Sequence, residues 1–513
     1  MSTAAEYLAF LHEKGVKLWV DQGQLRYHAR KGTLGAQELT RLRALKEGIV
    51  AELNKAPGST VDGSSPGGVA PAPGEAPLSF QQRFLLGLLQ GNPNWGATQS
   101  YVFRLQGPLD PRALERSLDA MVQRHPALRT RIVIVDGGVR QQIESVHGFH
   151  LAVTAVSGEA EVARSAQAAV ADLVSRRLDP GIAPLVAAHL LEVSQREHLL
   201  VLVIHRLATD CLGVSHALRD LWVLYGQALR GLGSLASEGS SPYRDYARWQ
   251  QASDGAWQQK HAAFWQEHLA GAEPIRWPSK EGMGELPSGH SATLALASVQ
   301  CSFGESLSAA VRELSRQTQS LPALVVLALY VASVSRWCGQ RDFVAPFLIA
   351  GRNSEHEAVV GYFTHIVFLR VHVGERDTFK ELLKRVSNEF YRAAAFRQDF
   401  GRVAAQQSRL LSGALCQWLS WHPAAVAGLE TGDPARPAGL DIERMPPLDL
   451  EELTNVPPAM VGLEISFFEA AGDIAALAIY RNERFAQSTV QGFLTAVQAT
   501  AERVTRGGPL LGV

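Results

Sequence analysis

A stretch rich in proline, glycine, serine and alanine divides the chain into two unequal parts. It spans residues 54–77 and reads NKAPGSTVDGSSPGGVAPAPGEAP. Segments of this composition bury too little apolar surface to fold, so they act as flexible tethers. The chain has 513 residues, and single cores stop growing at roughly 250 to 300 residues. We therefore predict a small N-terminal module at 1–55, a linker at 56–76 and a large body with more than one core.

The composition narrows the class of protein. It is 46% hydrophobic and 19% charged, as in ordinary globular proteins. The net charge of −1 gives no electrostatic reason to expect nucleic acid or an anionic membrane as a partner. The four cysteines lack metal-ligand spacing and are few for this length, which predicts no metal site and no disulfide framework. The N-terminus lacks the pattern of a secretory signal, so we expect a cytoplasmic protein.

The most apolar segment of the chain is LPALVVLALYVASVSRW at 321–337. It contains Pro322, Tyr330 and two serines, and it is shorter than the roughly 20 residues that span a bilayer. We therefore predict a buried core helix here rather than a membrane helix.

The small module has its own pattern of secondary structure. Apolar residues recur at helical spacing over 4–15 and over 36–53, and two short β-rich runs at 18–20 and 25–27 flank a turn at 21–23. This pattern predicts an α+β unit of helix, β-hairpin and helix. The hairpin region is basic, and a short hairpin has an edge that can accept a strand from a partner. The module either captures an acidic peptide tail or presents a solvated basic surface with no partner.

Residues 4–54 resemble the N-terminal β-hairpin docking domain of nonribosomal peptide and hybrid polyketide assembly lines. The stretch GVKLWVDQGQLRYHARKGTL matches the pattern G-x-x-L-W-x-x-x-G-x-L-R-Y of that family. In the family, the hairpin receives a short C-terminal motif of the upstream subunit. The resemblance implies docking to an acyl or peptidyl carrier protein in trans through an acidic C-terminal tail. The residues expected to contact that tail are Lys17, Trp19, Arg26, Tyr27, Arg30 and Lys31.

Residues 77–513 resemble the condensation-domain family of the same assembly lines. Motifs of that family occur in the family order as PLSFQQRFLLGL, RHPALRTRI, SPYRDYARWQ, IAGRNSEHEAVVGYFTHIVFLR and FRQDFGRV. The resemblance implies an α/β fold of two lobes like chloramphenicol acetyltransferase, packed into a V, at 77–255 and 256–513. A tunnel for two carrier-bound arms would run between them. It further implies no directly bound cofactor, because the substrate is carried on the phosphopantetheine of a partner carrier protein.

A further motif, VLVIHRLATDCLG, follows an apolar run that predicts a buried strand. Aligned with the family motif H-H-x-x-x-D-G, His205 is the first histidine, Arg206 replaces the second, Asp210 is kept and Cys211 replaces the glycine. In the family, the second histidine faces the tunnel and acts on the nucleophile or the tetrahedral intermediate. The resemblance implies that His205 and Asp210 are mainly structural and that Asp210 pairs with Arg352.

Two further motif residues are expected to support the site structurally. They are Arg129, in RHPALRTRI, and Gly361, in the motif that also contains Arg352. The residue at the glycine position, Cys211, follows an aspartate whose charge would raise the pKa of its thiol, so we interpret it as a small packing residue.

Three interpretations of Arg206 are open. In the first, the domain is catalytically silent and serves recruitment; a related noncatalytic family member that binds cytochrome P450 enzymes also has H-R here. In the second, Arg206 stabilises the oxyanion while positioning supplies the remaining rate enhancement. In the third, His365 acts as the base, because a histidine with an ordinary pKa near 6.5 suits that task. The alternative for His365 is a structural histidine at a position where the family has asparagine.

The main hypothesis is an acyltransferase of the condensation type. It would take a thioester-bound acyl chain from a docked carrier protein and transfer it to an amine or alcohol, and so release the chain as an amide or ester in antibiotic or other secondary metabolism. The catalytic candidates are Arg206, His205, Asp210 and His365. We expect a free-standing protein, because no further assembly-line domain follows residue 513. The alternative is a silent condensation-like domain that recruits a carrier or a tailoring enzyme.

Overall fold

The computed structural model divides the chain into two compact units, Met1–Ala70 and Pro71–Val513. The structure describes residues 17–21, 24–28, 46, 75–91, 97–135, 138–146, 148–156, 159–175, 178–232, 242–252, 255–278, 295–397, 410, 414–419, 437–445, 462–470 and 472–510.

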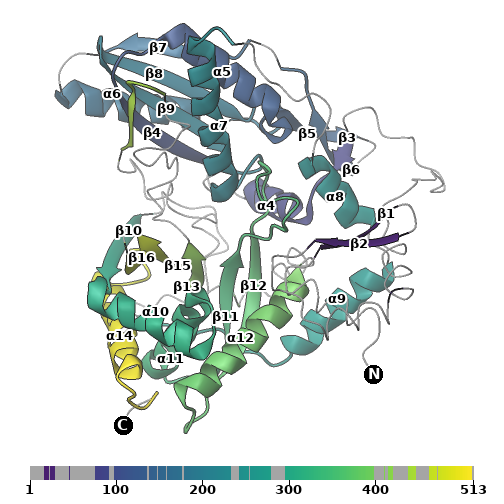
Figure 1. The fold of residues 1–513 in the computed structure, drawn as a ribbon, viewed down its shortest axis with the longest axis vertical. Helices are drawn as coiled ribbons and strands as arrows, with labels where there is room; N and C mark the ends of the chain where they lie inside the picture. The colour runs from purple at the N-terminus through teal and green to yellow at the C-terminus, as the bar shows by residue number, and fades with distance from the viewer. Residues whose placement is uncertain are drawn as a thin grey trace. The chain divides into compact units, whose positions relative to one another are not determined.

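The first unit contains the predicted β-hairpin. Strands β1 (Lys17–Asp21) and β2 (Gln24–His28) pair antiparallel, with Trp19 opposite Arg26 and Leu18 opposite Tyr27 (Figure 1). The hairpin prediction is therefore confirmed, and Lys17, Trp19, Arg26 and Tyr27 all lie on its strands. The predicted docking residues Arg30 and Lys31 lie outside the described residues, as do the two predicted helices of the module, apart from Lys46, which is helical.

The first sheet of the larger unit has the strand order β14-β4-β9-β8-β7 (Figure 1). Strand β9 is buried on both faces. Leu200 and Leu202 join the core formed with α5 and α7, whereas Val201 and Val203 join the core formed with α6. Burial on both faces explains the uninterrupted apolar run before His205. The elements are β4 (Thr98–Gln106), α5 (Pro111–Arg124), β7 (Ala152–Ala155), α6 (Glu159–Ser175), β8 (Val186–Ser194), β9 (Glu197–His205) and α7 (Cys211–Leu229).

A smaller antiparallel sheet has the order β3-β6-β5, and its strand β3 contacts helix α8. A short 3-10 helix, Pro126–Arg129, leads directly into β5. Helices α4 and α8 contribute Leu85, Tyr243 and Tyr246 to a separate buried cluster that also contains Phe363. The elements are β3 (Glu75–Pro77), α4 (Phe80–Gly91), β5 (Thr130–Val135), β6 (Gly138–Ile143) and α8 (Pro242–Ala252).

The second large sheet has the order β10-β16-β15-β13-β11-β12 (Figure 1). The main core lies between one face of this sheet and helices α10, α11, α12 and α14, while Phe468, Leu477 and Ile479 form a separate cluster. The strands are β10 (Leu296–Ser302), β11 (Asp342–Ile349), β12 (His365–His372), β13 (Ala414–Leu419), β15 (Leu463–Ala470) and β16 (Asp473–Arg481). The helices are α9 (Gly255–His268), α10 (Gly304–Thr318), α11 (Pro322–Cys338), α12 (Phe379–Ala395) and α14 (Gln487–Thr505).

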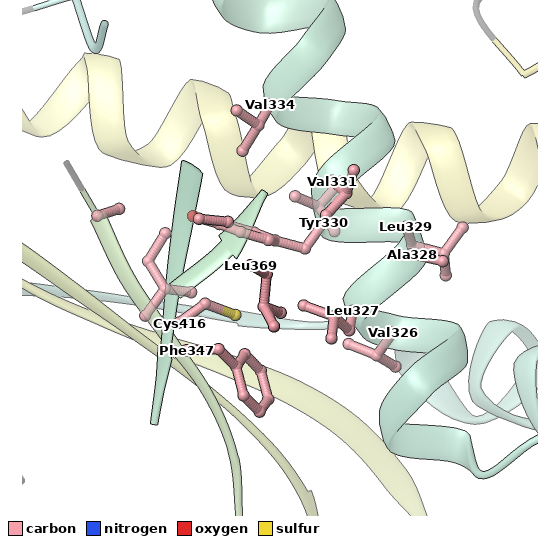
Figure 2. Close-up of a cluster of buried hydrophobic side chains, with 14 of the residues drawn as sticks. Val326, Leu327, Ala328, Leu329, Tyr330, Val331, Val334, Phe347, Leu369 and Cys416 are labelled. Carbon is pink, nitrogen blue, oxygen red and sulfur yellow. The ribbon is translucent and has the colours of Figure 1, made fainter. Parts of the chain in front are cut away.

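Helix α11 is the most apolar segment and runs through this core. It begins with Pro322, whose fixed φ suits a first helical position, and ends before Gly339, which adopts φ 65°. Figure 2 shows Val326, Leu327 and Tyr330 among strand residues. The prediction of a buried core helix is thus confirmed. In the described part of the chain no single helix is long and apolar enough to cross a membrane, and α10 and α11 meet those criteria only as a pair bent by 107°.

One strand departs from the expected division at residue 255. Strand β14 (Asp441–Arg444) comes from the C-terminal half of the chain, yet it pairs antiparallel with β4 of the first sheet, with Ile442 opposite Leu105. Ile442 and Leu440 are buried in the core of that sheet. The C-terminal half of the chain therefore contributes a strand to the first sheet, which simple alternation of helices and strands did not predict.

Candidate functional site

His205 is the last residue of β9 and is 1% exposed. Its Nδ1 accepts a hydrogen bond from the backbone N–H of Leu207 at 3.0 Å, and its carbonyl accepts from Ala208 at 2.9 Å. Burial, together with the charge of the nearby Arg206 guanidinium, lowers the pKa of His205 to about 4. The imidazole is neutral at pH 7, and its contacts fix the turn that follows the strand. This geometry supports the structural role that the resemblance implies for His205.

Asp210 caps the N-terminus of α7 from an extended backbone conformation. One carboxylate oxygen, Oδ1, accepts from the N–H of Gly213 at 2.9 Å, as N-cap residues do. The other, Oδ2, accepts from Arg352 Nη1 at 2.6 Å, from Phe363 N–H at 3.0 Å and from the Thr364 hydroxyl at 3.4 Å. A single buried carboxylate therefore joins the end of β9 to the segment between β11 and β12.

Arg352 completes this junction, and the predicted pairing with Asp210 is present with both side chains about 5% exposed. Its Nη2 donates to the carbonyls of Val359 at 3.1 Å and Gly361 at 3.3 Å, and the guanidinium lies 4.5 Å from the centroid of the Phe363 ring. Charge-assisted bonds and a cation–π contact thus hold Arg352 in a single orientation.

Gly361 supports the same junction through its backbone. Its carbonyl accepts from the N–H of Asp210 at 3.2 Å, and a Cβ at this position would overlap the ring of Tyr243. The Tyr243 hydroxyl in turn donates to the carbonyl of Tyr362 at 2.7 Å. Only glycine allows α8 to approach the loop this closely, so the predicted supporting role of Gly361 has a steric basis.

Arg206 follows His205 in the turn after β9 and is 2% exposed. Its backbone N–H donates to the carbonyl of Ala97 at 2.8 Å. Its guanidinium acts on two neighbouring side chains: it partly offsets the rise that burial causes in the pKa of the Cys211 thiol and of the Tyr362 phenol. Arg206 is therefore a buried residue that acts on Cys211 and Tyr362, and it does not lie on the surface.

Cys211 is the first residue of α7. Burial raises the pKa of its thiol to about 11, and the charge of Asp210 contributes in the same direction. The side-chain amide of Gln99 donates to the sulfur at 3.8 Å. A thiol that holds its proton at neutral pH is a poor nucleophile, which supports the interpretation of Cys211 as a packing residue.

Three polar residues of the second large sheet form a cluster that the sequence patterns did not reveal. Gln417 on β13 donates from Nε2 to Glu464 Oε1 at 2.7 Å and to Ser466 Oγ at 2.6 Å, and all three are at most 2% exposed. The charge of Glu464 raises the pKa of both Tyr362 and Cys211. The sequence contains one signal of this cluster, because Glu464 stands inside the apolar run GLEISFF. Fully buried glutamate is rare, so a glutamate in such a run indicates a special environment.

His365 begins β12 and is 1% exposed. Its ring nitrogens bond to the side-chain amide of Gln81, and its Nε2 lies 3.4 Å from the Tyr246 hydroxyl. Burial lowers its pKa to about 3, and the charge of Arg397 acts in the same direction. These contacts favour the structural interpretation of His365 over proton transfer, because so weak a base takes up a proton poorly.

Arg129 lies apart from these residues, at the end of the short 3-10 helix that precedes β5. It donates from Nη1 to the carbonyl of Glu144 at 2.8 Å and so holds the β5–β6 hairpin. A cavity of about 360 Å³ between β8 and α6 includes none of the predicted site residues. Among the described residues, no group of histidine, cysteine, aspartate and glutamate side chains could hold a metal ion.

Comparison with known families identifies the family of the chain. Residues 72–410 match the condensation domain, and residues 5–54 match the TubC N-terminal docking domain. The chain belongs to the condensation-domain family. It is thus a condensation domain of the type found in nonribosomal peptide assembly lines, with an N-terminal docking domain, as the motifs predicted.

Curated relatives of this condensation domain are much longer than the chain. It is 31% identical over 337 residues to one of the linear gramicidin synthase proteins of Brevibacillus parabrevis, which covers 63% of the chain and 6% of that protein. It is 28% identical over 439 residues to the bassianolide nonribosomal cyclodepsipeptide synthetase of Beauveria bassiana, covering 82% and 13%. The chain therefore spans a small part of the length of these relatives.

Solved structures share the fold. The EpoB cyclization-docking bidomain from Sorangium cellulosum aligns over 99% of both chains, with a TM-score of 0.67 and 20% identity. The X-domain from teicoplanin biosynthesis aligns over 85% of this condensation domain and 97% of that chain, with a TM-score of 0.69 and 20% identity. The predicted α/β fold with a preceding docking domain is confirmed.

The buried, neutral His205 predicts a dependence of stability on pH. The pKa is near 6.5 in an unfolded chain and about 4 in the folded one, so between these values only the unfolded state takes up the proton. The contribution of His205 to the free energy of unfolding is fully present above pH 6.5. It is lost as the pH drops toward 4, at a cost of about 3 kcal/mol. Urea unfolding at pH 7 and at pH 4.5 measures this effect. Between these pH values the free energy of unfolding of His205→Gln should fall by less than that of the wild type.

The matched control for this measurement is His150→Gln, because the side chain of His150 is 86% exposed. It should reproduce the wild-type loss between the two pH values. Other buried histidines, including His365, contribute equally to the pH dependence of the wild type and of His205→Gln. The difference between these two proteins therefore isolates the effect of His205. An identical pH dependence in His205→Gln and the wild type would contradict a neutral, buried His205.

Proposed function

We propose that this protein is an acyltransferase of the condensation type that works in the cytoplasm. It takes an acyl chain from the phosphopantetheine thioester of a carrier protein and transfers it to an amine or alcohol. The observation that carries the proposal is the intact junction of Asp210 with Arg352, Phe363 and Thr364. This junction fixes the turn that carries Arg206, so the buried guanidinium would take up a defined position in the site.

Arg206 has the central role in this proposal. A guanidinium cannot act as a base near neutral pH, but it donates hydrogen bonds to negative charge. When a nucleophile attacks the thioester carbonyl, charge develops on the carbonyl oxygen, and Arg206 stabilises that oxyanion. The burial of Arg206 strengthens this effect, because charges interact more strongly where water is excluded. Asp210 and His205 fix the backbone on both sides of Arg206.

The docking unit brings the carrier to this site. The hairpin of β1 and β2 carries Lys17 and Arg26 on its strands, and a partner strand can add to such an edge. An acidic C-terminal tail of the carrier protein is the complement of this basic hairpin. Tethering by the linker raises the effective concentration of the carrier, to the mM range for short flexible linkers.

A second function has one observation in its favour. The X-domain from teicoplanin biosynthesis shares the fold, and its solved complex with OxyB aligns over 86% of this chain with a TM-score of 0.66. The second function is therefore recruitment of a carrier or tailoring enzyme by a silent domain, with Arg206 filling the space between the carrier-bound arms. It predicts a stable complex without turnover.

Replacing Arg206 tests the acyltransferase directly. A carrier domain of the same assembly line, loaded with an acyl chain, is mixed with the protein and ethanolamine, which offers an amine and a hydroxyl. Intact-protein mass spectrometry follows the loss of the acyl group. The wild type should remove it, and Arg206→Ala should be about 100-fold to 1,000-fold slower, the usual cost of one oxyanion donor.

The control for this assay is Arg341→Ala. Arg341 pairs with Glu375 at 3.0 Å on the surface, far in the sequence from the motif, so this variant should match the wild type. A wild type that leaves the acyl group in place, yet co-elutes with a tailoring enzyme on gel filtration, would overturn the acyltransferase in favour of recruitment.

Docking is tested by deleting residues 1–70, the whole first unit, which leaves the compact unit Pro71–Val513. Calorimetry against the carrier protein with its native C-terminal tail should show at least about a tenfold loss of affinity, because the tether no longer concentrates the carrier. Affinity of the full chain should also fall as salt rises, since the expected contacts are charged. Equal affinities of the full and shortened chains would reject the docking role.

A further inference from the structure

The second large sheet presents its polar residues on the face away from the helices. Side chains alternate along a strand, and on β15 Ile465 and Phe467 belong to the core beneath α11 and α14. Glu464 and Ser466 therefore lie on the opposite face. On β13, Cys416 points into the same helical core, where Figure 2 shows it near Phe347, so Gln417 also lies on the opposite face.

These polar residues form a connected group. A single amide, Gln417 Nε2, donates to Glu464 and to Ser466, and this leaves the other end of the amide facing away from both. Gln417 is 1% exposed, and its Oε1 accepts no hydrogen bond from any residue in the described part of the chain. A buried acceptor without a donor is costly, so a group that binds here should bring an N–H or O–H of its own.

The same group lies beside the condensation motif. Glu464 and Arg206 both act electrostatically on the Cys211 thiol and on the Tyr362 hydroxyl, with opposite signs. A carboxylate from the second large sheet and a guanidinium that follows β9 are therefore both close enough to act on the same two side chains. One of these side chains, Cys211, belongs to the motif, and Arg206 occupies the position of its second histidine.

We propose that Glu464 accepts the proton of the attacking amine or alcohol, while Gln417 Oε1 receives a hydrogen bond from the same nucleophile and orients it. This role rests on the proposed acyl transfer. It divides the task of one histidine between two residues, with Arg206 facing the developing oxyanion and Glu464 facing the nucleophile. The acceptor substrate is therefore a small molecule with at least two N–H or O–H donors at its reacting end.

Atoms and electrons balance across this step. The lone pair of the nucleophile forms the new C–N or C–O bond at the thioester carbon, and the carbonyl electron pair moves to the oxygen, which Arg206 stabilises. Glu464 takes the proton that the nucleophile loses. When the carbonyl re-forms, the C–S bond breaks, and the thiolate of phosphopantetheine receives the proton from Glu464. The products are an amide or ester and a free carrier thiol.

The test measures transfer from the acyl-loaded carrier to ethanolamine under single-turnover conditions. Glu464→Gln keeps the shape of the side chain and removes the proton acceptor, so its rate at saturating ethanolamine should fall about 100-fold or more. Glu464→Asp should recover part of that rate. Glu469→Gln is the control on the same strand, because Glu469 pairs with Arg312 at 2.9 Å near the surface, and it should match the wild type.

Gln417→Met is a second variant that keeps the proposal falsifiable if Glu464→Gln does not fold, as judged by its melting temperature. It removes the orienting acceptor and should raise the KM for ethanolamine more than it lowers kcat. Wild-type turnover with an unchanged rate in a folded Glu464→Gln, or with unchanged constants in Gln417→Met, would overturn this inference alone. Absence of turnover in the wild type would overturn the proposed function and this inference with it.

Discussion

The contact between Asp210 and Arg352 is the constraint on which the site depends. Asp210 follows the turn after β9, caps the N-terminus of α7 and accepts hydrogen bonds from the segment between β11 and β12. Removing either partner would leave a charge buried without compensation, which typically costs about 3 to 5 kcal/mol. The steric requirements at Gly361 follow from this contact, because the loop can reach Asp210 only if it packs directly on Tyr243. The backbone around Arg206 is therefore fixed by residues that do not themselves act on a substrate.

This arrangement separates the scaffold from the chemistry. The positions that hold the turn keep the family residues, whereas the second histidine of the motif has changed to Arg206. A fixed backbone tolerates such a change, because it holds the new side chain in a defined position. The roles proposed for Arg206 and Glu464 illustrate how a proton acceptor can come from another sheet when the motif itself no longer provides one.

Much of the fold could be predicted from the sequence, but less of the site. The hairpin at β1 and β2, the buried strand β9 and the core helix α11 follow from periodicity and apolar runs, which are local signals. The pairing of Asp210 with Arg352 came only through the family resemblance. The pairing of β14 with β4 and the cluster around Gln417 depend on contacts between residues far apart in the sequence, which no local pattern indicates. The weak basicity of His365 likewise follows from burial beside Gln81, and the sequence alone left its pKa at the ordinary value.

The buried contact between Asp210 and Arg352 holds the site together, and its strength can be measured. The measurement is a double-mutant cycle in urea unfolding, with Asp210→Asn, Arg352→Met and the two combined. We expect each single variant to lose about 3 kcal/mol or more, and the double variant to lose clearly less than their sum, with a coupling energy of about 2 kcal/mol or more. Losses that add to within about 0.5 kcal/mol would contradict this contact, because independent residues show no coupling.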